Sequence, residues 1–280
     1  MNKYSPFWVV PYISNNIDIK LYKNWIFFSS LEVIEGISPL NDKGEDFYNI
    51  LRREVSLYDN CLWIFNDSKF EEEEYAKLNI ILKNSLETYL YSFISRPGII
   101  IFYKNGGFTE QPPSFENFTT GVVENVTNEK IKRILKITDF IYQRELNHYL
   151  EIFEYLREIK KSKTFIRELA LWSFVEQHWK SKEGEYIEKS LKNMKAFIFG
   201  EDYRNEFRRS FDENLKKFNF SISNKKGNVG EIRNSLAHGS FFKNKKNWNE
   251  DDWDLFFNIH NKLFDMILLG IEKEIFEVVN

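Results

Sequence analysis

The chain has 280 residues, which is enough for one large domain or two smaller ones with buried cores. Its 39 basic and 42 acidic residues give a net charge of -3, which excludes a globally positive nucleic-acid binder and makes any RNA contact local. The single cysteine, Cys61, excludes an internal disulfide, and no stretch reaches the roughly 18 to 20 apolar residues that cross a bilayer, so we expect a cytoplasmic protein without membrane contact.

The first 125 residues alternate short apolar runs with helical patterns, as α/β and α+β domains do. Apolar runs predict strands at residues 8–13, 25–34, 61–65 and 98–103. Apolar residues at helical spacing predict helices at residues 44–58 and 72–93. We therefore expect a mixed α/β region, for which sensing or regulation is one hypothesis.

Residues 104–120 are rich in residues that break regular structure. The segment holds two glycines, two prolines and several hydroxyl side chains. It predicts a boundary between a first domain over residues 1–125 and a second over residues 126–280.

The second half carries four or five successive helical patterns, and no strand signal is strong there. A long amphipathic stretch covers residues 128–159, with Asp139 as the place where it would break. Further patterns cover residues 164–179, 186–199 and 204–218, followed by a long last helix. That last helix carries more apolar residues than one buried stripe requires, namely Trp253, Phe256, Phe257, Phe264 and Ile267. The region predicts a helix bundle, so the fold class is α+β overall.

Residues 228–239, NVGEIRNSLAHG, carry signals for both ends of a short helix. Asn228 is a favoured N-cap residue, and Glu231 three residues later can reach back to its backbone N–H. Gly239 suits the left-handed position just after a helix. The segment therefore predicts a helix over residues 229–238.

Three polar residues of this helix are placed for chemistry. Asn234 and His238 are four residues apart and share a face. Arg233 lies roughly 140° around the helix from His238, so only a long side chain brings its charge near the imidazole. The negative end of the helix dipole favours the imidazolium form of His238, which suits acid–base catalysis.

Residues 233–238, RNSLAH, resemble the R-x4-6-H motif of HEPN ribonucleases, which favour a polar residue directly after the arginine. The following glycine and the late position in a helical region also fit, and similar strings are frequent in the Apea-like branch. No other Arg–His pair in the chain has these spacings. The resemblance covers about residues 128–280 and implies a HEPN-like all-α bundle there.

The resemblance implies a metal-independent endoribonuclease in prokaryotic defence or a toxin system. RNA supplies its own 2'-OH nucleophile, while His238 moves a proton and Arg233 stabilises charge on phosphorus, with Asn234 beside them. The resemblance to HEPN enzymes also implies a two-fold dimer in which the motifs of both copies line one cleft. We expect RNA as substrate, a homodimer through the C-terminal domain, and an antitoxin or other regulatory partner.

A different class of function also fits these residues: a non-catalytic HEPN-like module for dimerisation or for binding RNA or a nucleotide, in which Arg233 and His238 only cap carbonyls and pair with acids. Glu176 is the candidate to orient Arg233, with an exposed position on a solvated face as its alternative, and Glu231 is a further supporting candidate. His260 is interpreted as a core histidine. His148 and His178 lack a second ligand at helical spacing, so we expect neither metal nor cofactor.

Overall fold

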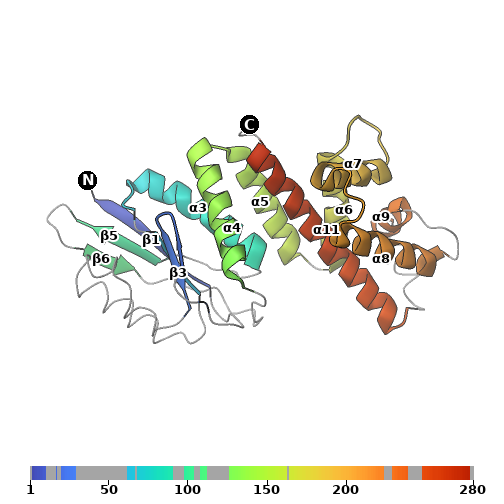
Figure 1. Cartoon of the computed structure of the whole chain (residues 1–280), viewed down its shortest axis with the longest axis horizontal. Helices are drawn as coiled ribbons and strands as arrows, with labels where there is room; N and C mark the ends of the chain where they lie inside the picture. Colours follow the sequence, from blue (N-terminus) through green and yellow to red (C-terminus); the bar gives the residue numbers. More distant parts are fainter. Residues whose placement is uncertain are drawn as a thin grey trace. The chain divides into compact units, whose positions relative to one another are not determined.

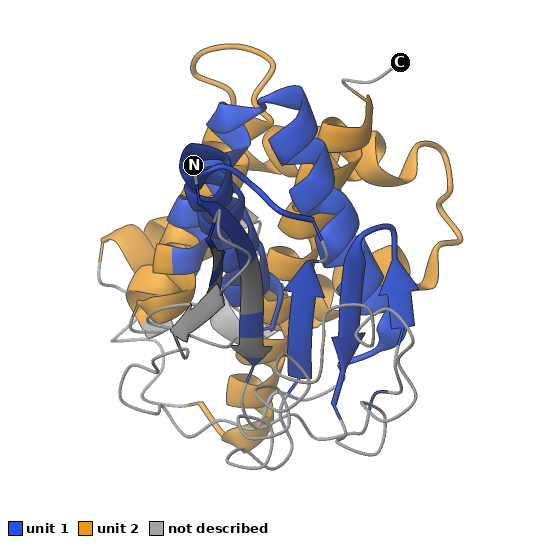
Figure 2. Ribbon diagram, turned by 90° about the vertical axis from the view of Figure 1, so that its left-hand side faces the viewer, with its two compact units in different colours: residues 1–157 blue, residues 158–280 orange. Residues whose placement is uncertain are grey.

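The computed structural model describes residues 2–10, 17, 20–29, 62–66, 68–90, 98–103, 108–111, 126–162, 164–223, 229–238 and 248–277. The predicted helix at 44–58, and the parts of predicted strands at 11–13 and 30–34, lie outside them. The layout is α+β, with an antiparallel sheet followed by helices (Figure 1). The chain divides into two compact units, Met1–Arg157 and Glu158–Asn280 (Figure 2).

Unit 1 contains an antiparallel sheet in the strand order β2-β3-β4-β1-β5-β6. The strands are β1 (Lys3–Val10), β2 (Lys20–Tyr22), β3 (Trp25–Phe28), β4 (Leu62–Asn66), β5 (Gly98–Phe102) and β6 (Phe108–Gln111). Strand β1 begins at Lys3, five residues before the predicted strand at 8–13, because Lys3 pairs with Phe102 of β5. The polar residues at the start of β1 are therefore also paired in the sheet. The edge strands β2 and β6 were not predicted, since each is short and partly polar.

Two helices of unit 1 pack together, α3 (Glu72–Leu90) and α4 (Asn128–Arg144), and α3 also packs against β1. Buried tryptophans of the sheet bond to them: Trp8 Nε1 donates to Asn79 Oδ1 over 3.1 Å, and Trp25 Nε1 donates to Asp139 Oδ1 over 2.9 Å. Asp139 therefore stays helical rather than breaking the stretch. The break falls at Glu145, whose φ of 55° is left-handed.

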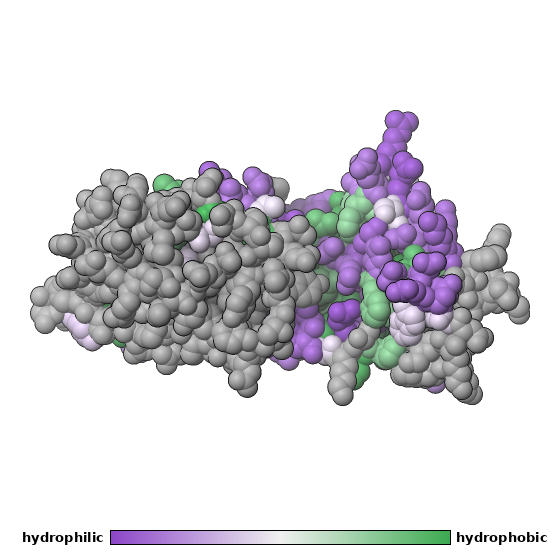
Figure 3. Space-filling view, turned by 90° about the horizontal axis from the view of Figure 1, so that it is seen from below, coloured by the Kyte–Doolittle hydropathy of each residue, from purple (hydrophilic) through white to green (hydrophobic). Residues whose placement is uncertain are grey.

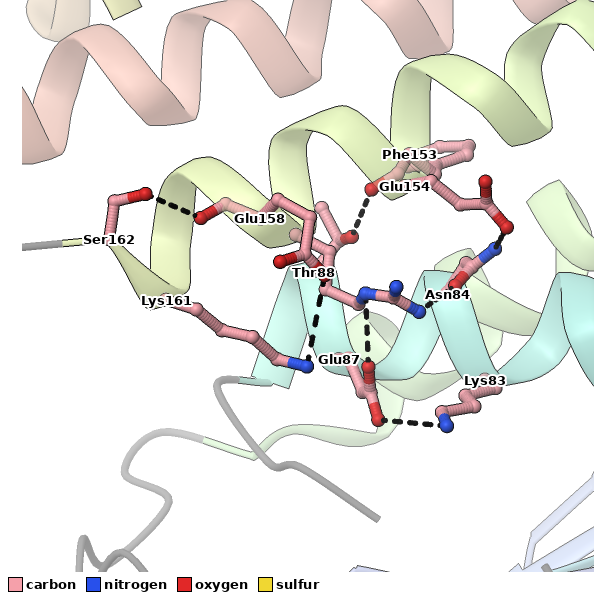
Figure 4. A network of polar contacts seen from close by, with 10 residues as sticks. Lys83, Asn84, Glu87, Thr88, Phe153, Glu154, Glu158, Lys161 and Ser162 are labelled. Carbon is pink, nitrogen blue, oxygen red and sulfur yellow. Dashed lines mark hydrogen bonds and ion pairs between the residues drawn. The ribbon is translucent and has the colours of Figure 1, made fainter. Parts of the chain in front are cut away.

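The predicted boundary at residue 125/126 differs from the division between the units at 157/158. Helix α4 belongs to unit 1, and so does α5 (Asn147–Lys161) as far as Arg157. Figure 4 shows polar contacts from α3 to α5. Arg157 Nη1 donates to Asn84 Oδ1 over 2.7 Å, and Arg157 Nε lies 3.5 Å from the buried Glu87 carboxylate. Residues of α4 and α5 thus cover the buried face of α3. The predicted boundary missed this, because it was based on the composition of residues 104–120 and not on which helices pack together.

Unit 2 consists of helices in the described part of the chain. They are α6 (Thr164–His178), α7 (Ile187–Phe199), α8 (Glu206–Ser223), α9 (Val229–Ala237) and α11 (Glu250–Glu277). Helix α11 packs against α6, α7 and α8, and the short α9 packs against the same three helices. None of the helices in the described segments is long and apolar enough to cross a membrane.

His260 lies in the core of unit 2, which confirms the prediction of a core histidine. Its ring is fully buried, its Nε2 accepts from Trp172 Nε1 over 2.9 Å, and its Nδ1 donates to the Phe256 carbonyl over 2.7 Å. Burial lowers the pKa of His260 to about 3, so the ring is neutral. Burial also raises the pKa of the neighbouring Glu168 carboxyl to about 7, against the opposing charge of Arg167.

Candidate functional site

The predicted motif helix is present as α9, and the His238 N–H closes its last turn by donating to the Asn234 carbonyl over 2.9 Å. Ile232, Ser235 and Leu236 are buried, whereas Asn234 and His238 are exposed. The apolar face thus holds the helix against its unit, and the polar residues face outwards. The predicted caps Asn228 and Gly239, and the side chain of Glu231, lie outside the described residues.

Arg233 is held at the surface by an ion pair with Glu176 of α6. Arg233 Nη2 lies 3.0 Å from Glu176 Oε2, and Arg233 Nη1 donates to Asn234 Oδ1 over 3.4 Å. Charge rather than an aligned hydrogen bond holds the pair, because Glu176 Oε2 and Arg233 Nε have no hydrogen-bond partner among the described residues. The structure therefore brings together Arg233, Asn234 and Glu176, three of the predicted site residues.

The N-terminus of α9 is capped from another helix. The Gly230 N–H donates to Glu188 Oε1 over 2.8 Å, and Glu188 lies in the first turn of α7. A carboxylate at this place satisfies a backbone donor and favours the positive end of the helix dipole. Sequence reasoning considered only local caps for α9, so it missed Glu188.

A cleft of about 770 Å³ lies beside Arg233 within unit 2. Residues from α6, from the start of α7 and from α9 line it, among them Glu176, Tyr186, Glu188, Lys189, Arg233 and Asn234. Its volume is in the range of pockets that bind small molecules or single nucleotides, about 300 to 1,000 Å³. The motif arginine thus forms part of the wall of a recess large enough for a ligand.

Among the described residues, three carboxylates and two cations line the cleft, and each of these carboxylates has a partner. Glu176 pairs with Arg233, Glu188 caps α9, and Glu185 Oε1 lies 2.6 Å from Lys189 Nζ. Hydrogen bonds from Lys189 and from the Ser181 backbone lower the pKa of Glu185 to about 2, so it remains ionised. The described lining residues therefore sum to a formal charge of one negative unit.

His238 lies one helical turn beyond Asn234, outside the lining of this cleft. No hydrogen bond or ion pair joins its ring to any residue in the described ranges. Arg233 points its charge at Glu176 rather than at His238. Arg233 thus lies in α9 and His238 directly follows it, and no hydrogen bond or ion pair joins the two side chains.

The remaining histidines of unit 2 are engaged in structure. His178 Nε2 lies 2.9 Å from Glu274 Oε2, and its ring stacks on Phe174 with centroids 5.1 Å apart. Within the described segments, no group of three or more His, Cys, Asp or Glu side chains is arranged to hold a metal ion.

Comparisons with known proteins add no relative to this picture: no family model matches the chain, and searches of curated proteins and of solved structures found no significant match. The resemblance to HEPN ribonucleases therefore depends on residues 233–238 and on their helical setting. Any activity that this resemblance implies is a proposal.

Proposed function

We propose that this protein is a metal-independent endoribonuclease of HEPN type that acts as a homodimer. The observation that carries the proposal is the arrangement on α9. Arg233 is fixed at the wall of a cleft by Glu176, Asn234 lies beside it, and His238 follows one turn later with an exposed ring. A cation for phosphate and a titratable group for proton transfer thus lie along one edge of unit 2.

The chemistry uses the 2'-OH of the RNA as its nucleophile and needs two proton transfers. A base removes the proton from the 2'-OH, and the 2'-oxygen forms a bond to phosphorus. The bond from phosphorus to the 5'-oxygen then breaks, and that oxygen takes up a proton. His238 serves one of these two proton transfers, and Arg233 stabilises the added negative charge on the phosphate. The products are a 2',3'-cyclic phosphate and a 5'-hydroxyl.

Glu176 has a positioning role in this scheme. Its carboxylate fixes the Arg233 guanidinium at 3.0 Å, and Asn234 Oδ1 holds the same group from the other side. A fixed cation stabilises developing charge without reorganising during the reaction. The N–H groups of Nη1 and Nη2 that Glu176 and Asn234 leave free are donors for phosphate oxygens, whereas Nε is buried.

A second His238, from a symmetry-related copy, would serve the other proton transfer, which is why we propose a homodimer. Among the large apolar residues of the last helix that were expected to exceed one buried stripe, Phe256, Phe264 and Ile267 are buried. The other two, Trp253 and Phe257, are only partly exposed, which leaves little apolar surface at these positions for an interface. Figure 3 shows hydrophobic residues interspersed with hydrophilic ones on the visible face of unit 2. We place the two-fold axis near the exposed end of α9 instead.

The test is incubation of the purified chain with total RNA in EDTA, beside the His238→Ala variant. We expect cleavage that survives EDTA and falls about 10²- to 10⁴-fold in His238→Ala, the usual cost of losing a general acid or base. His148→Ala is the matched control, because His148 is another exposed histidine on a helix. A requirement for a divalent ion, or equal loss in both variants, contradicts the proposal.

One observation favours a second candidate, a non-catalytic module that binds RNA or a nucleotide. Arg233 is paired with Glu176 and does not contact His238, so α9 has the geometry of a binding site as well as that of a reaction centre. RNA binding without any cleavage, lost in Arg233→Ala, identifies this candidate. The proposed setting for either is the cytoplasm of a prokaryote, in defence or in a toxin system with a silencing partner.

A further inference from the structure

Tyr186 occupies a position that its own helix does not favour. It is the N-cap residue of α7, where its side chain makes no capping hydrogen bond. Serine, threonine, aspartate and asparagine are the residues that stabilise this position, because their side chains accept from the first free N–H groups. Tyr186 therefore forgoes the stabilisation that a better cap would provide.

The ring of Tyr186 also gains nothing from packing. At 82% exposed, it is the most exposed large hydrophobic side chain in the described residues. Tyr203, exposed to 68%, has the Arg208 guanidinium 4.4 Å above its ring, whereas no ring or cation contact engages Tyr186 in the described part of the chain. An aromatic ring that stabilises neither its helix nor the core is available for a ligand.

The residues around Tyr186 indicate the chemical class of ligand that its ring would contact. It lines the cleft beside Arg233 together with Asn234, whose amide offers two N–H donors while its Oδ1 holds Arg233. Proteins recognise unpaired nucleobases by stacking them on aromatic rings and bonding their edges with amide side chains. We propose that this cleft is a subsite for one unpaired nucleobase, stacked on Tyr186 and hydrogen-bonded by Asn234.

The charge of the cleft agrees with a neutral base rather than an anion. Among the described lining residues, three carboxylates, Glu176, Glu185 and Glu188, face two cations, Arg233 and Lys189, and this balance disfavours a ligand with several negative charges. The same carboxylates accept hydrogen bonds, and the amino groups of nucleobases donate them. The phosphate linked to the base then lies outside the cleft, towards the exposed end of α9.

This inference deepens the proposed function by naming the substrate class as single-stranded RNA cut next to an unpaired base. In a duplex the base is stacked and paired, so it cannot enter the cleft. Binding of a strand that cannot be cut is independent of the chemistry at His238. It therefore tests the subsite separately from the ribonuclease activity.

The experiment uses the full chain with His238→Ala and a labelled 2'-O-methyl RNA of mixed sequence, followed by fluorescence anisotropy. We expect the single strand to bind and the same strand annealed to its complement to bind at least tenfold more weakly. Adding Tyr186→Ser should weaken single-strand binding roughly 5- to 150-fold, the worth of one stacked base. Tyr186→Trp should retain it, and Tyr203→Ser, a matched exposed tyrosine, should have no effect.

Thermal unfolding separates a ligand contact from a structural role. Serine is a better N-cap, so Tyr186→Ser should unfold at the same or a higher temperature while it loses binding. Equal binding by Tyr186→Ser, equal binding of the duplex, or no binding of the single strand overturns the subsite. Tyr186-dependent binding by a protein that cleaves no RNA supports the subsite and rejects the ribonuclease. Cleavage that is lost in His238→Ala but unchanged in Tyr186→Ser supports the ribonuclease and rejects the subsite.

Discussion

Arginine–glutamate pairs occur in both units, and their surroundings differ. In unit 1, Glu87 is 1% exposed and lies 3.5 Å from Arg157, within a network that joins α3 to α5. In unit 2, Glu176 is 24% exposed and lies 3.0 Å from Arg233, beside a cleft. The carboxylate of the first pair is almost completely buried, whereas both side chains of the second pair are partly exposed. The same two residue types therefore stabilise the fold in one unit and remain available to a ligand in the other.

Removal of the buried carboxylate should have the largest effect on stability. Glu87→Ala removes the carboxylate that lies 3.5 Å from Arg157, whose side chain is only 19% exposed. We expect a loss of about 3 to 5 kcal/mol in the free energy of unfolding, the usual cost of breaking a buried pair by removing one partner. Urea unfolding followed by circular dichroism measures it. A loss below about 1 kcal/mol would show that this pair behaves like a surface pair.

The buried groups around His260 predict a pH dependence of stability. Glu168 has a folded pKa of about 7 against 4.5 for the free group, so its contribution to stability falls as pH rises through this window. His260 has a folded pKa of about 3 against 6.5, so its contribution rises with pH from about 3 to 6.5. Between pH 4.5 and 6.5 the two slopes oppose each other.

Glu168→Gln should remove one of these opposing slopes. The stability of the variant should then rise with pH between 4.5 and 6.5, by up to about 1.4 kcal/mol per pH unit relative to the parent chain. Urea midpoints measured at several pH values across the window give the slope. Parallel curves for the two proteins contradict the assignment of the raised pKa to Glu168.

The solvent-accessible pair should behave in the opposite way to the buried one. Glu176→Gln should change the free energy of unfolding by less than about 1 kcal/mol, because both side chains of the pair are partly exposed and solvent screens their charges. It should lower kcat for RNA cleavage about 10- to 100-fold with a small change in KM, since a misplaced Arg233 no longer meets the transition state. Glu176→Asp should restore part of kcat. An unchanged kcat in Glu176→Gln would contradict the role of Glu176 in positioning Arg233.

Sequence patterns predicted the elements whose signal is local. Helix α6 was expected at 164–179 from its apolar spacing and spans Thr164–His178. Helix α9 was expected at 229–238 from signals at its two ends and spans Val229–Ala237. The edge strand β6 lies in the segment taken as a boundary, since its residues FTEQ carry no alternation of apolar side chains over a useful length. The assignment of α4 to unit 1 depends on what covers α3, which is a tertiary property.

The residues of the candidate site also divide into those with a local sequence signal and those whose role depends on tertiary packing. Arg233, Asn234 and His238 were predicted because their spacing on one helix is visible in the sequence. Glu176 was a candidate to orient Arg233, with an exposed position as its alternative, and the two side chains do form an ion pair. Glu188 and Tyr186 were not predicted, because a cap reaching from another helix and the exposure of a ring depend on packing. One signal was present: a tyrosine directly before an apolar helix, where a capping residue is favoured.

The most direct test of the central claim is the fate of an RNA with one 2'-deoxy or 2'-O-methyl nucleotide at the cleavage site. If Arg233 and His238 promote attack by the 2'-OH, the modified RNA stays intact while the unmodified RNA gives 2',3'-cyclic phosphate ends, both in EDTA. Efficient cleavage of the modified strand, or products that carry a 3'-hydroxyl, would contradict the proposed reaction.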